Sequence, residues 1–379
     1  MIDITEVIRQ SRAYFCVDCG KCTAVCPVNH YDPQFSPRLI VQKALRDKYK
    51  AYSDPKIWSC IGCNMCMIRC NYSVSYVDMI RHLRMKSREN GTEPLYSHGC
   101  VTEAVMHLMG NEKIKQVRND WIPSDIQIDG SCKSAFFVGC APYFDIIFQE
   151  LNVHLTAGVV GAMRLLNHAG VPFTVLDNER CCGHDLILAG DLKGFLKLGK
   201  ANHEELKMRG VEKIITACPE CYYTFKMDYP KYIEGWDLQI VHVTELPEIQ
   251  TIKGKANSTR ATYHDPCTLG RGLKIYDAPR KLLTDVAGME IVEMENNHEN
   301  SLCCGASPWI FCGAVNKQIQ DERLGQAKST GVDQLVTSCP KCLIHLTCAA
   351  RFSNGKYDDL KIVDLYQLVG QSLARKENT

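Results

Sequence analysis

Cysteine is the residue that most constrains this chain. The sequence holds 22 cysteines among 379 residues, and eighteen of them fall into four spaced groups. Thiolate sulfur is the ligand of iron–sulfur clusters, and cysteines at short fixed spacings are typical of metal-binding loops. So many sulfur atoms at such spacings indicate a chain that binds metal. We therefore expect iron–sulfur clusters and electron transfer, and not the chemistry of ordinary reactive thiols.

The first two groups share one spacing. Residues 16–26 read CVDCGKCTAVC, and residues 60–70 read CIGCNMCMIRC. This is the run of bacterial two-cluster ferredoxins, in which the fourth cysteine of each run binds the other cluster. The pattern predicts two cubane [4Fe-4S] clusters. Cluster one would take Cys16, Cys19, Cys22 and Cys70, and cluster two would take Cys60, Cys63, Cys66 and Cys26.

One residue departs from that pattern. Asn71 stands where the second run usually has proline, so a turn is less rigid but no ligand is lost. Zinc is the competing interpretation, because paired CxxC units also build tetrahedral thiolate sites. Four cysteines within eleven residues, twice over, favour iron.

The other two groups form an internal repeat. The first copy contains FFVGC, RCCGHD and ACPEC, and the second contains YHDPC, LCCGAS and SCPKC about 120 to 130 residues later. The copies also end alike, with LQIVHVTEL at 238–246 and LKIVDLYQL at 360–368. A fixed period of this kind indicates a duplicated domain. The ten cysteines are Cys140, Cys181, Cys182, Cys218 and Cys221 in the first copy, and Cys267, Cys303, Cys304, Cys339 and Cys342 in the second.

Five cysteines per copy exceed what a cubane needs, and adjacent cysteines cannot easily both point into one small cube. The C, CCG, CxxC arrangement resembles the CCG domain of the heterodisulfide reductase catalytic subunit, here with an electron-carrying ferredoxin part fused in front. In that family each set of five cysteines holds a noncubane iron–sulfur cluster, and two such clusters face each other across the substrate disulfide. Since both sets are complete, the resemblance implies two noncubane [4Fe-4S] clusters. Iron–sulfur subunits of glycolate and lactate oxidases have a similar layout, including the HDPC phrase.

Composition excludes several classes of partner and compartment. With 44 basic and 43 acidic residues the net charge is +1, which argues neither for nucleic acid nor for a polyanionic membrane surface, and we expect no nucleic-acid partner. No stretch resembles a signal peptide, and no apolar run approaches the roughly 18 residues that span a bilayer. A secreted, disulfide-stapled chain would usually be short and carry such a signal. We expect a soluble protein of a reducing, anaerobic cytoplasm, held at the inner face of a membrane only through a partner.

The sequence predicts a helical ferredoxin-like unit, a linker and two α/β units. They span residues 1–95, 96–132, 133–258 and 259–379. A helical insert in the first unit is indicated by Leu39, Ile40, Ala44 and Leu45. The linker contains the turn-like phrases WIPSD and IDGSC.

Strands alternate with helices in the repeated units. In the first copy we expect strands at SAFFVG, PFTVLD, KIITA and IVHV, and helices over residues 159–169 and 186–209. This alternation predicts an α/β fold with parallel sheets. The cysteines follow the carboxyl ends of the strands, where open α/β sheets gather ligands. Cys218 and Cys221 lie where we expect a helix to begin after Pro219, and the helix dipole there would favour thiolate.

Several residues beside the cysteines have predicted roles. Gly183 and Gly305 follow the paired cysteines, and we expect them to bind the cofactor by close backbone approach, with an ordinary loop turn as the alternative. His184 is the catalytic candidate, a proton donor that titrates near neutral pH; a histidine that only braces the structure is the alternative. His264 and Asp265 are expected to brace a loop and tune a cluster. The remaining cysteines, Cys100, Cys132, Cys312 and Cys348, are expected to be small buried hydrophobes.

Two classes of function compete. A disulfide reductase would pass electrons from the cubanes to the noncubane clusters and split an S–S bond, which takes two electrons. By resemblance its substrate would be the coenzyme M–coenzyme B heterodisulfide or a related small disulfide. The alternative is a relay subunit of a larger flavin-containing oxidoreductase, as in glycolate or lactate oxidase assemblies. The completeness of both five-cysteine sets favours the reductase, although a relay can retain both sets.

A partner is expected in either case. The sequence has no GxGxxG after a strand and no phosphate-binding loop, so the electron donor must be oxidised elsewhere. The resemblance implies a flavin-containing electron-bifurcating subunit or a membrane cytochrome b subunit as that partner.

Overall fold

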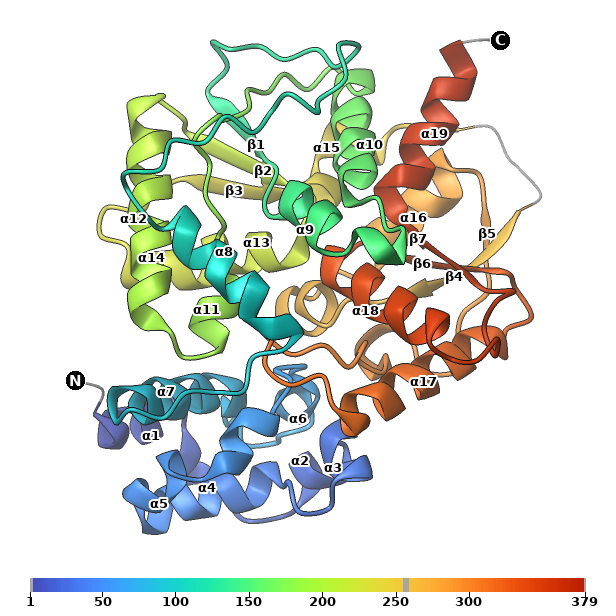
Figure 1. Ribbon diagram of the computed structural model, residues 1–379. Helices are drawn as coiled ribbons and strands as arrows, with labels where there is room; N and C mark the ends of the chain where they lie inside the picture. Colours follow the sequence, from blue (N-terminus) through green and yellow to red (C-terminus); the bar gives the residue numbers. More distant parts are fainter. Residues whose placement is uncertain (1–2, 255–258, 378–379) are drawn as a thin grey trace.

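The computed structural model describes residues 3–254 and 259–377. A helical unit at the N-terminal end lies below two lobes that each contain a parallel sheet (Figure 1). Its helices are α1 Ile4–Gln10, α2 Lys21–Ala24, α3 Pro27–Tyr31, α4 Pro37–Arg46, α5 Lys48–Tyr52, α6 Met65–Ile68 and α7 Tyr76–Glu89. The predicted helical insert is α4, in which Ile40, Val41 and Ala44 are buried while Leu39 is exposed.

The first lobe runs from β1 to α15, and α8 Val101–Met109 precedes it. Its elements are β1 Ser134–Phe137, α9 Ala141–Ile147, α10 Leu155–His168, α11 His184–Leu188, α12 Leu192–Met208, β2 Lys213–Thr216, α13 Pro219–Tyr223, α14 Tyr229–Tyr232, β3 Gln239–His242 and α15 Pro247–Gln250. The strands lie in the order β1-β2-β3 and are parallel, with Phe136 opposite Ile215.

The second lobe runs from β4 to α19. Its elements are β4 Arg260–His264, α16 Asp277–Lys281, β5 Glu290–Ile291, α17 Ala314–Lys328, β6 Gln334–Thr337, α18 Pro340–Arg351, β7 Lys361–Asp364 and α19 Leu365–Glu377. The strand order is β5-β4-β6-β7, again all parallel. The predicted α/β fold with parallel sheets is therefore confirmed.

Short helical turns of other kinds complete the described elements. They are η1 Ala13–Phe15, η2 Pro55–Ser59, η3 His98–Cys100, η4 Gln149–Leu151, η6 Val243–Glu245 and η9 His298–Asn300, and the π-helical turns η5 Thr224–Asp228, η7 Thr268–Gly272 and η8 Leu282–Val286.

One predicted strand is wrong. At PFTVLD only Thr174 pairs with β1: its amide donates to Ser134 O and its carbonyl accepts from Phe136 N, both at 2.8 Å. Two residues before Thr174, at the preceding position of the ladder, stands Pro172, which has no N–H to donate to β1. The segment is therefore a single bridge at the edge of the sheet.

The predicted helix over residues 186–209 is two helices. Gly190 adopts φ +79°, the left-handed conformation that ends a helix, and this separates α11 from α12. Asp191 then caps α12 by accepting a hydrogen bond from Gly194 N at 2.9 Å. Gly190 followed by Asp191 is a sequence signal for the end of one helix and the start of the next, and the helical pattern over residues 186–209 led us to overlook it.

The segment predicted as a linker is partly helical, since α8 lies within it and buries Met106 and Met109. The domain boundaries themselves stay predictions, and the one between residues 258 and 259 touches residues 255–258, which lie outside the described part.

The lobes share their cores. One buried apolar cluster joins the first lobe to α19, and another joins the N-terminal unit to the second lobe. Helix α10 of the first lobe packs closely on α19 of the second (Figure 1). A Cβ added at Gly161 would lie 2.0 Å from Tyr366 O, so the two backbones approach too closely for a side chain at residue 161.

Candidate metal centres

The structure brings the eighteen motif cysteines together around four cavities. The Cys19 cavity is lined by Cys16, Cys19, Cys22, Cys66 and Cys70, and the Cys60 cavity by Cys26, Cys60, Cys63 and, again, Cys66. The first-lobe cavity is lined by Cys140, Cys181, Cys182, Cys218 and Cys221, and the second-lobe cavity by Cys267, Cys303, Cys304, Cys339 and Cys342. This grouping agrees with the predicted exchange of Cys26 and Cys70 between runs; the ligand roles stay predictions.

Helix starts position many of these thiols. In the first lobe Cys140 and Cys218 precede α9 and α13, directly after the ends of β1 and β2. In the second lobe Cys339 precedes α18, directly after β6. Proline in the first turn of each helix fixes the helical backbone at that point. The thiols therefore converge at the carboxyl edges of the two sheets.

The donor sets fit a polycationic metal group. Cys140 Sγ lies 3.1 Å from Cys181 Sγ, and Cys342 Sγ lies 3.3 Å from Cys304 Sγ. Burial raises the pKa of the Cys63 and Cys66 thiols, so these thiols resist ionisation by themselves. Bound iron would stabilise the thiolate forms and offset that cost.

Two buried arginines brace the cysteine loops of the N-terminal unit. Arg84 donates to Cys60 O at 2.5 Å and also to Leu188 O at 2.8 Å, which ties this loop to the first lobe. Arg271 of the second lobe donates to Cys63 O at 2.7 Å. Because both guanidinium groups are buried, their charge is poorly screened and favours negative sulfur nearby. Sequence reasoning missed both residues.

The four cavities are adjacent in a row. The Cys19 and Cys60 cavities share Cys66 and Tyr76 in their walls. The Cys60 and second-lobe cavities share Ile61, Asn64 and Val77. The two lobe cavities share His184, Glu220 and Lys341. A single layer of side chains thus separates each cavity from the next.

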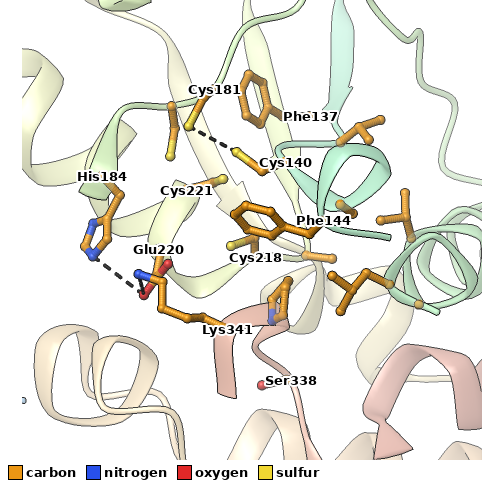
Figure 2. Close-up of a pocket in the computed structure, with 18 of the residues that line it drawn as sticks. Phe137, Cys140, Phe144, Cys181, His184, Cys218, Glu220, Cys221, Ser338 and Lys341 are labelled. Atoms are coloured by element: carbon orange, nitrogen blue, oxygen red, sulfur yellow. Dashed lines mark hydrogen bonds and ion pairs between the residues drawn. The ribbon is translucent and has the colours of Figure 1, made fainter. Parts of the chain in front are cut away.

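An ion cluster forms the wall between the lobe cavities. Lys341 of the second lobe contacts Glu220 of the first lobe at 3.0 Å (Figure 2). It also pairs with Asp185 of the first lobe. Although burial works to lower the pKa of Lys341, the two carboxylates outweigh it and raise that pKa. Glu220 and Lys341 occupy the same place in the two copies, CPEC and CPKC. The opposite charges at this place were a signal that sequence reasoning overlooked.

His184 does not match its predicted titration. Burial and, to a lesser extent, the nearby Lys341 ammonium together lower its pKa to about 3. Its Nδ1 lies 3.1 Å from Thr224 Oγ1, and its Nε2 lies 3.8 Å from Glu220. The imidazole is therefore neutral at pH 7, which corrects the expectation of a group that changes charge there.

Both glycines that follow the paired cysteines have a left-handed backbone conformation and no room for a side chain. Gly183 and Gly305 have φ +82° and +71°. A Cβ would lie 2.8 Å from the Phe195 ring at Gly183 and 2.8 Å from Asn316 O at Gly305. The Gly183 amide also donates to Cys181 Sγ at 3.4 Å, so one of the two does reach a motif thiol.

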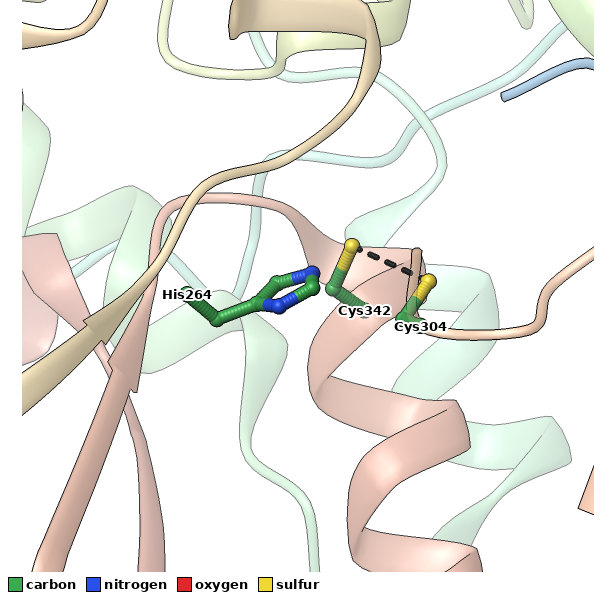
Figure 3. Close-up of side chains that lie close together, drawn as sticks. All are labelled: His264, Cys304 and Cys342. Atoms are coloured by element: carbon green, nitrogen blue, oxygen red, sulfur yellow. Dashed lines mark hydrogen bonds between the residues drawn. The ribbon is translucent and has the colours of Figure 1, made fainter. Parts of the chain in front are cut away.

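His264 and Asp265 lie beside the second-lobe cavity. Asp265 accepts two hydrogen bonds from Arg280, at 2.6 and 2.9 Å, and one from His298 N at 2.9 Å, so it holds its loop as expected. The His264 ring faces the sulfur atoms of Cys304 and Cys342 (Figure 3).

The cysteines outside the motifs are not fully buried. Cys100 is exposed, and Cys132, Cys312 and Cys348 are partly buried, which corrects the expectation of small buried hydrophobes. Burial still raises the pKa of Cys312.

Comparison with known proteins agrees with this layout. Residues 15–74 match the 4Fe-4S dicluster domain, and residues 134–226 and 261–347 each match the cysteine-rich domain CCG. This chain belongs to the iron–sulfur proteins that carry paired CCG domains. The predicted resemblance to the heterodisulfide reductase subunit with a fused ferredoxin part is confirmed.

Proteins similar to this CCG-domain protein include subunits of different oxidoreductases. The D-type subunit of dihydromethanophenazine:CoB–CoM heterodisulfide reductase from Methanosarcina acetivorans is 27% identical, over 94% of this chain and 93% of the relative. The B-type subunit of fumarate reductase (CoM/CoB) from Methanothermobacter marburgensis is 28% identical, over 93% and 71%. The EtfAB:quinone oxidoreductase of Syntrophomonas wolfei is 26% identical, over 94% and 58%. The chain is thus an iron–sulfur subunit of oxidoreductase type.

Within residues 3–254 and 259–377, no helix is both long and apolar enough to cross a bilayer.

Proposed function

We propose that this protein is the iron–sulfur subunit of a disulfide reductase that cleaves a small heterodisulfide of the CoM-S-S-CoB kind. The observation that carries the proposal is the pair of complete five-cysteine sets, which line neighbouring cavities with a shared wall. When bound, two cubane and two noncubane [4Fe-4S] clusters would supply the two electrons that an S–S bond requires. The eighteen motif cysteines would hold them in the sets given by the four cavities.

The row of cavities supports a proposal that electrons enter at the Cys19 cavity and move toward the lobes. Cys19 is exposed and Cys16, Cys22 and Cys70 are partly buried, whereas all four cysteines of the neighbouring Cys60 cavity are buried. Tyr14, Phe15 and Val17, next to Cys19 in sequence, are 59%, 57% and 55% exposed. Large exposed apolar side chains are typical of contact surfaces. A partner subunit, either flavin-containing or a membrane cytochrome b, would dock here and deliver electrons to the Cys19 end.

A relay subunit is the second candidate function. The name of one relative favours it, because the EtfAB:quinone oxidoreductase, which is 26% identical over 94% of this chain, is not named for a disulfide. In that role the chain would carry electrons between a flavin-containing subunit and another acceptor, and no disulfide would bind between the lobes.

Anaerobic purification followed by iron and sulfide analysis tests the metal content. About sixteen iron atoms per chain are expected for four four-iron clusters. About eight would remove the paired noncubane centres from the proposal.

Titration of the reduced protein with small disulfides, followed by electron paramagnetic resonance (EPR), then separates the two functions. The reductase predicts stoichiometric thiol release and a substrate-dependent EPR signal. A full iron complement with neither of these would favour the relay. The matched control is Cys132→Ser, since Cys132 belongs to none of the four cysteine sets and this variant should behave as wild type.

A further inference from the structure

His264 is fully buried at the end of β4, and one partner fixes where its proton sits. Arg323 Nε donates a hydrogen bond to His264 Nδ1 at 3.0 Å. A guanidinium group has no acceptor, so Nδ1 has to accept and cannot carry a hydrogen. The ring proton of the neutral imidazole therefore lies on Nε2.

Arg323 is itself held rigidly. It is fully buried, and its other nitrogens donate to Asn296 O at 2.7 Å, Gln326 Oε1 at 2.8 Å and Ser301 Oγ at 3.0 Å. The bonds to Asn296 and Ser301 anchor it to the loop between β5 and α17, and the bond to Gln326 joins it to its own helix. The orientation of the His264 ring is thus set by the fold before any cofactor binds.

The Nε2–H group points at sulfur. Among the described residues it has no hydrogen-bond partner, although it is buried. A ligand atom of the ring and the Cys304 and Cys342 Sγ atoms all lie within 4.8 Å of one another. Figure 3 shows the ring edge farthest from Cβ turned toward both cysteines. A buried donor without a protein partner is costly unless a bound group accepts its hydrogen bond.

The first lobe has no such donor at the matching place. Aligning YHDPC with FFVGC puts Phe137 opposite His264. The Phe137 ring packs edge-on against Phe225, with ring centroids 4.6 Å apart, and lines the first-lobe cavity. A phenyl ring has no N–H. The two copies therefore differ in one hydrogen bond aimed at their cysteine sets.

We propose that His264, oriented by Arg323, donates its Nε2–H to sulfur of the second-lobe metal centre and thereby makes that centre easier to reduce than its first-lobe counterpart. This inference rests on the proposed function, since it needs a cluster in each lobe. Adding an electron places negative charge on the sulfur, and a hydrogen bond from an N–H group stabilises that charge, so it raises the reduction potential. His264 is a positioning residue: no bond to it forms or breaks.

The test is His264→Phe in the full-length, iron-loaded protein, which gives the second lobe the residue of the first. An EPR-monitored redox titration should show one centre becoming harder to reduce, by about tenfold in the equilibrium constant for adding one electron, or about 59 mV. Pulsed EPR on protein labelled with ¹⁵N-histidine should lose one nitrogen coupling. Unchanged potentials together with an unchanged coupling would overturn the inference.

The control is Thr262→Val, a nearly isosteric change two residues earlier on β4. The Thr262 hydroxyl is buried and makes no hydrogen bond among the described residues, so neither potential should move. If His264→Phe fails to retain iron, His264→Leu takes its place, because it also removes the N–H group, is smaller than phenylalanine and leaves the buried Arg323 charge in place. The shift should then have the same sign, and no shift would contradict the inference. A wild-type protein with about eight iron atoms would instead count against the proposed function.

Discussion

Asp364 at the end of β7 has a carboxylate that is 5% exposed. Its Oδ1 accepts from Tyr366 N at 2.8 Å and Gln367 N at 3.2 Å, and no ion pair with a basic side chain is found for it in the described chain. Burial raises its pKa to about 6, against an ordinary value of 3.8. The folded state therefore holds this proton more tightly than the unfolded chain does. The resulting stability is fully present below pH 3.8 and is lost as the pH rises through about 6.

Asp364→Asn should remove this pH dependence. The amide oxygen can still accept from Tyr366 N, while the buried charge is gone. We expect the variant to be more stable than wild type at pH 7, by about 3 kcal/mol at most, and to match it near pH 4. Anaerobic thermal unfolding at the two pH values measures the difference. A variant that is less stable at pH 7 would contradict the assignment.

At the scale of elements, the contact between α10 and α19 depends on one small residue. A Cβ at Gly161 would meet the backbone of Tyr366, and backbone atoms cannot move aside as a flexible side chain can. Gly161→Ala should therefore force the two helices apart and cost about 1–3 kcal/mol or more in unfolding free energy. Denaturant unfolding under anaerobic conditions measures it.

Gly325→Ala is the matched control for that change. Gly325 lies within α17, and its added Cβ would meet only Tyr357 Oη at 3.8 Å, an ordinary contact. Alanine is the better helix former, so this variant should gain up to about 1 kcal/mol. Equal losses in both variants would mean that the helix contact is not the cause.

At the scale of the whole molecule, the buried ion cluster joins the lobes. Lys341→Met would leave Asp185 and Glu220 buried without their cation and should cost about 3–5 kcal/mol. The triple variant with Asp185→Asn and Glu220→Gln removes the stranded charges as well and should recover most of that loss. Thermal unfolding of both proteins decides. If the triple variant is no more stable than Lys341→Met, the interaction is not electrostatic.

The sequence predicted the parts of this structure that depend on spacing. The two cysteine runs and the internal repeat predicted which cysteines line the same cavity, because the length of a loop limits which sulfur atoms can lie close together. The parallel sheets followed from alternating strands and helices. What sequence could not supply was contact between distant segments: the pairing of Lys341 with Glu220, or the burial that keeps His184 neutral. Pro172 argues against a strand and Gly190 against a continuous helix, but the apolar patterns around them led to the opposite predictions.

Among the eighteen motif cysteines, Cys19 alone is exposed to solvent. Oxidative damage follows accessibility, so air should attack this end before it reaches the sulfurs within the lobes, which are buried or partly buried. A sample briefly exposed to oxygen would then keep most of its iron but would no longer accept electrons from its physiological donor. A small artificial reductant that reaches the lobes directly would still reduce the metal centres there. Under the proposed function, loss of donor-driven activity would in that case indicate damage at the Cys19 end and not at the metal centres of the lobes.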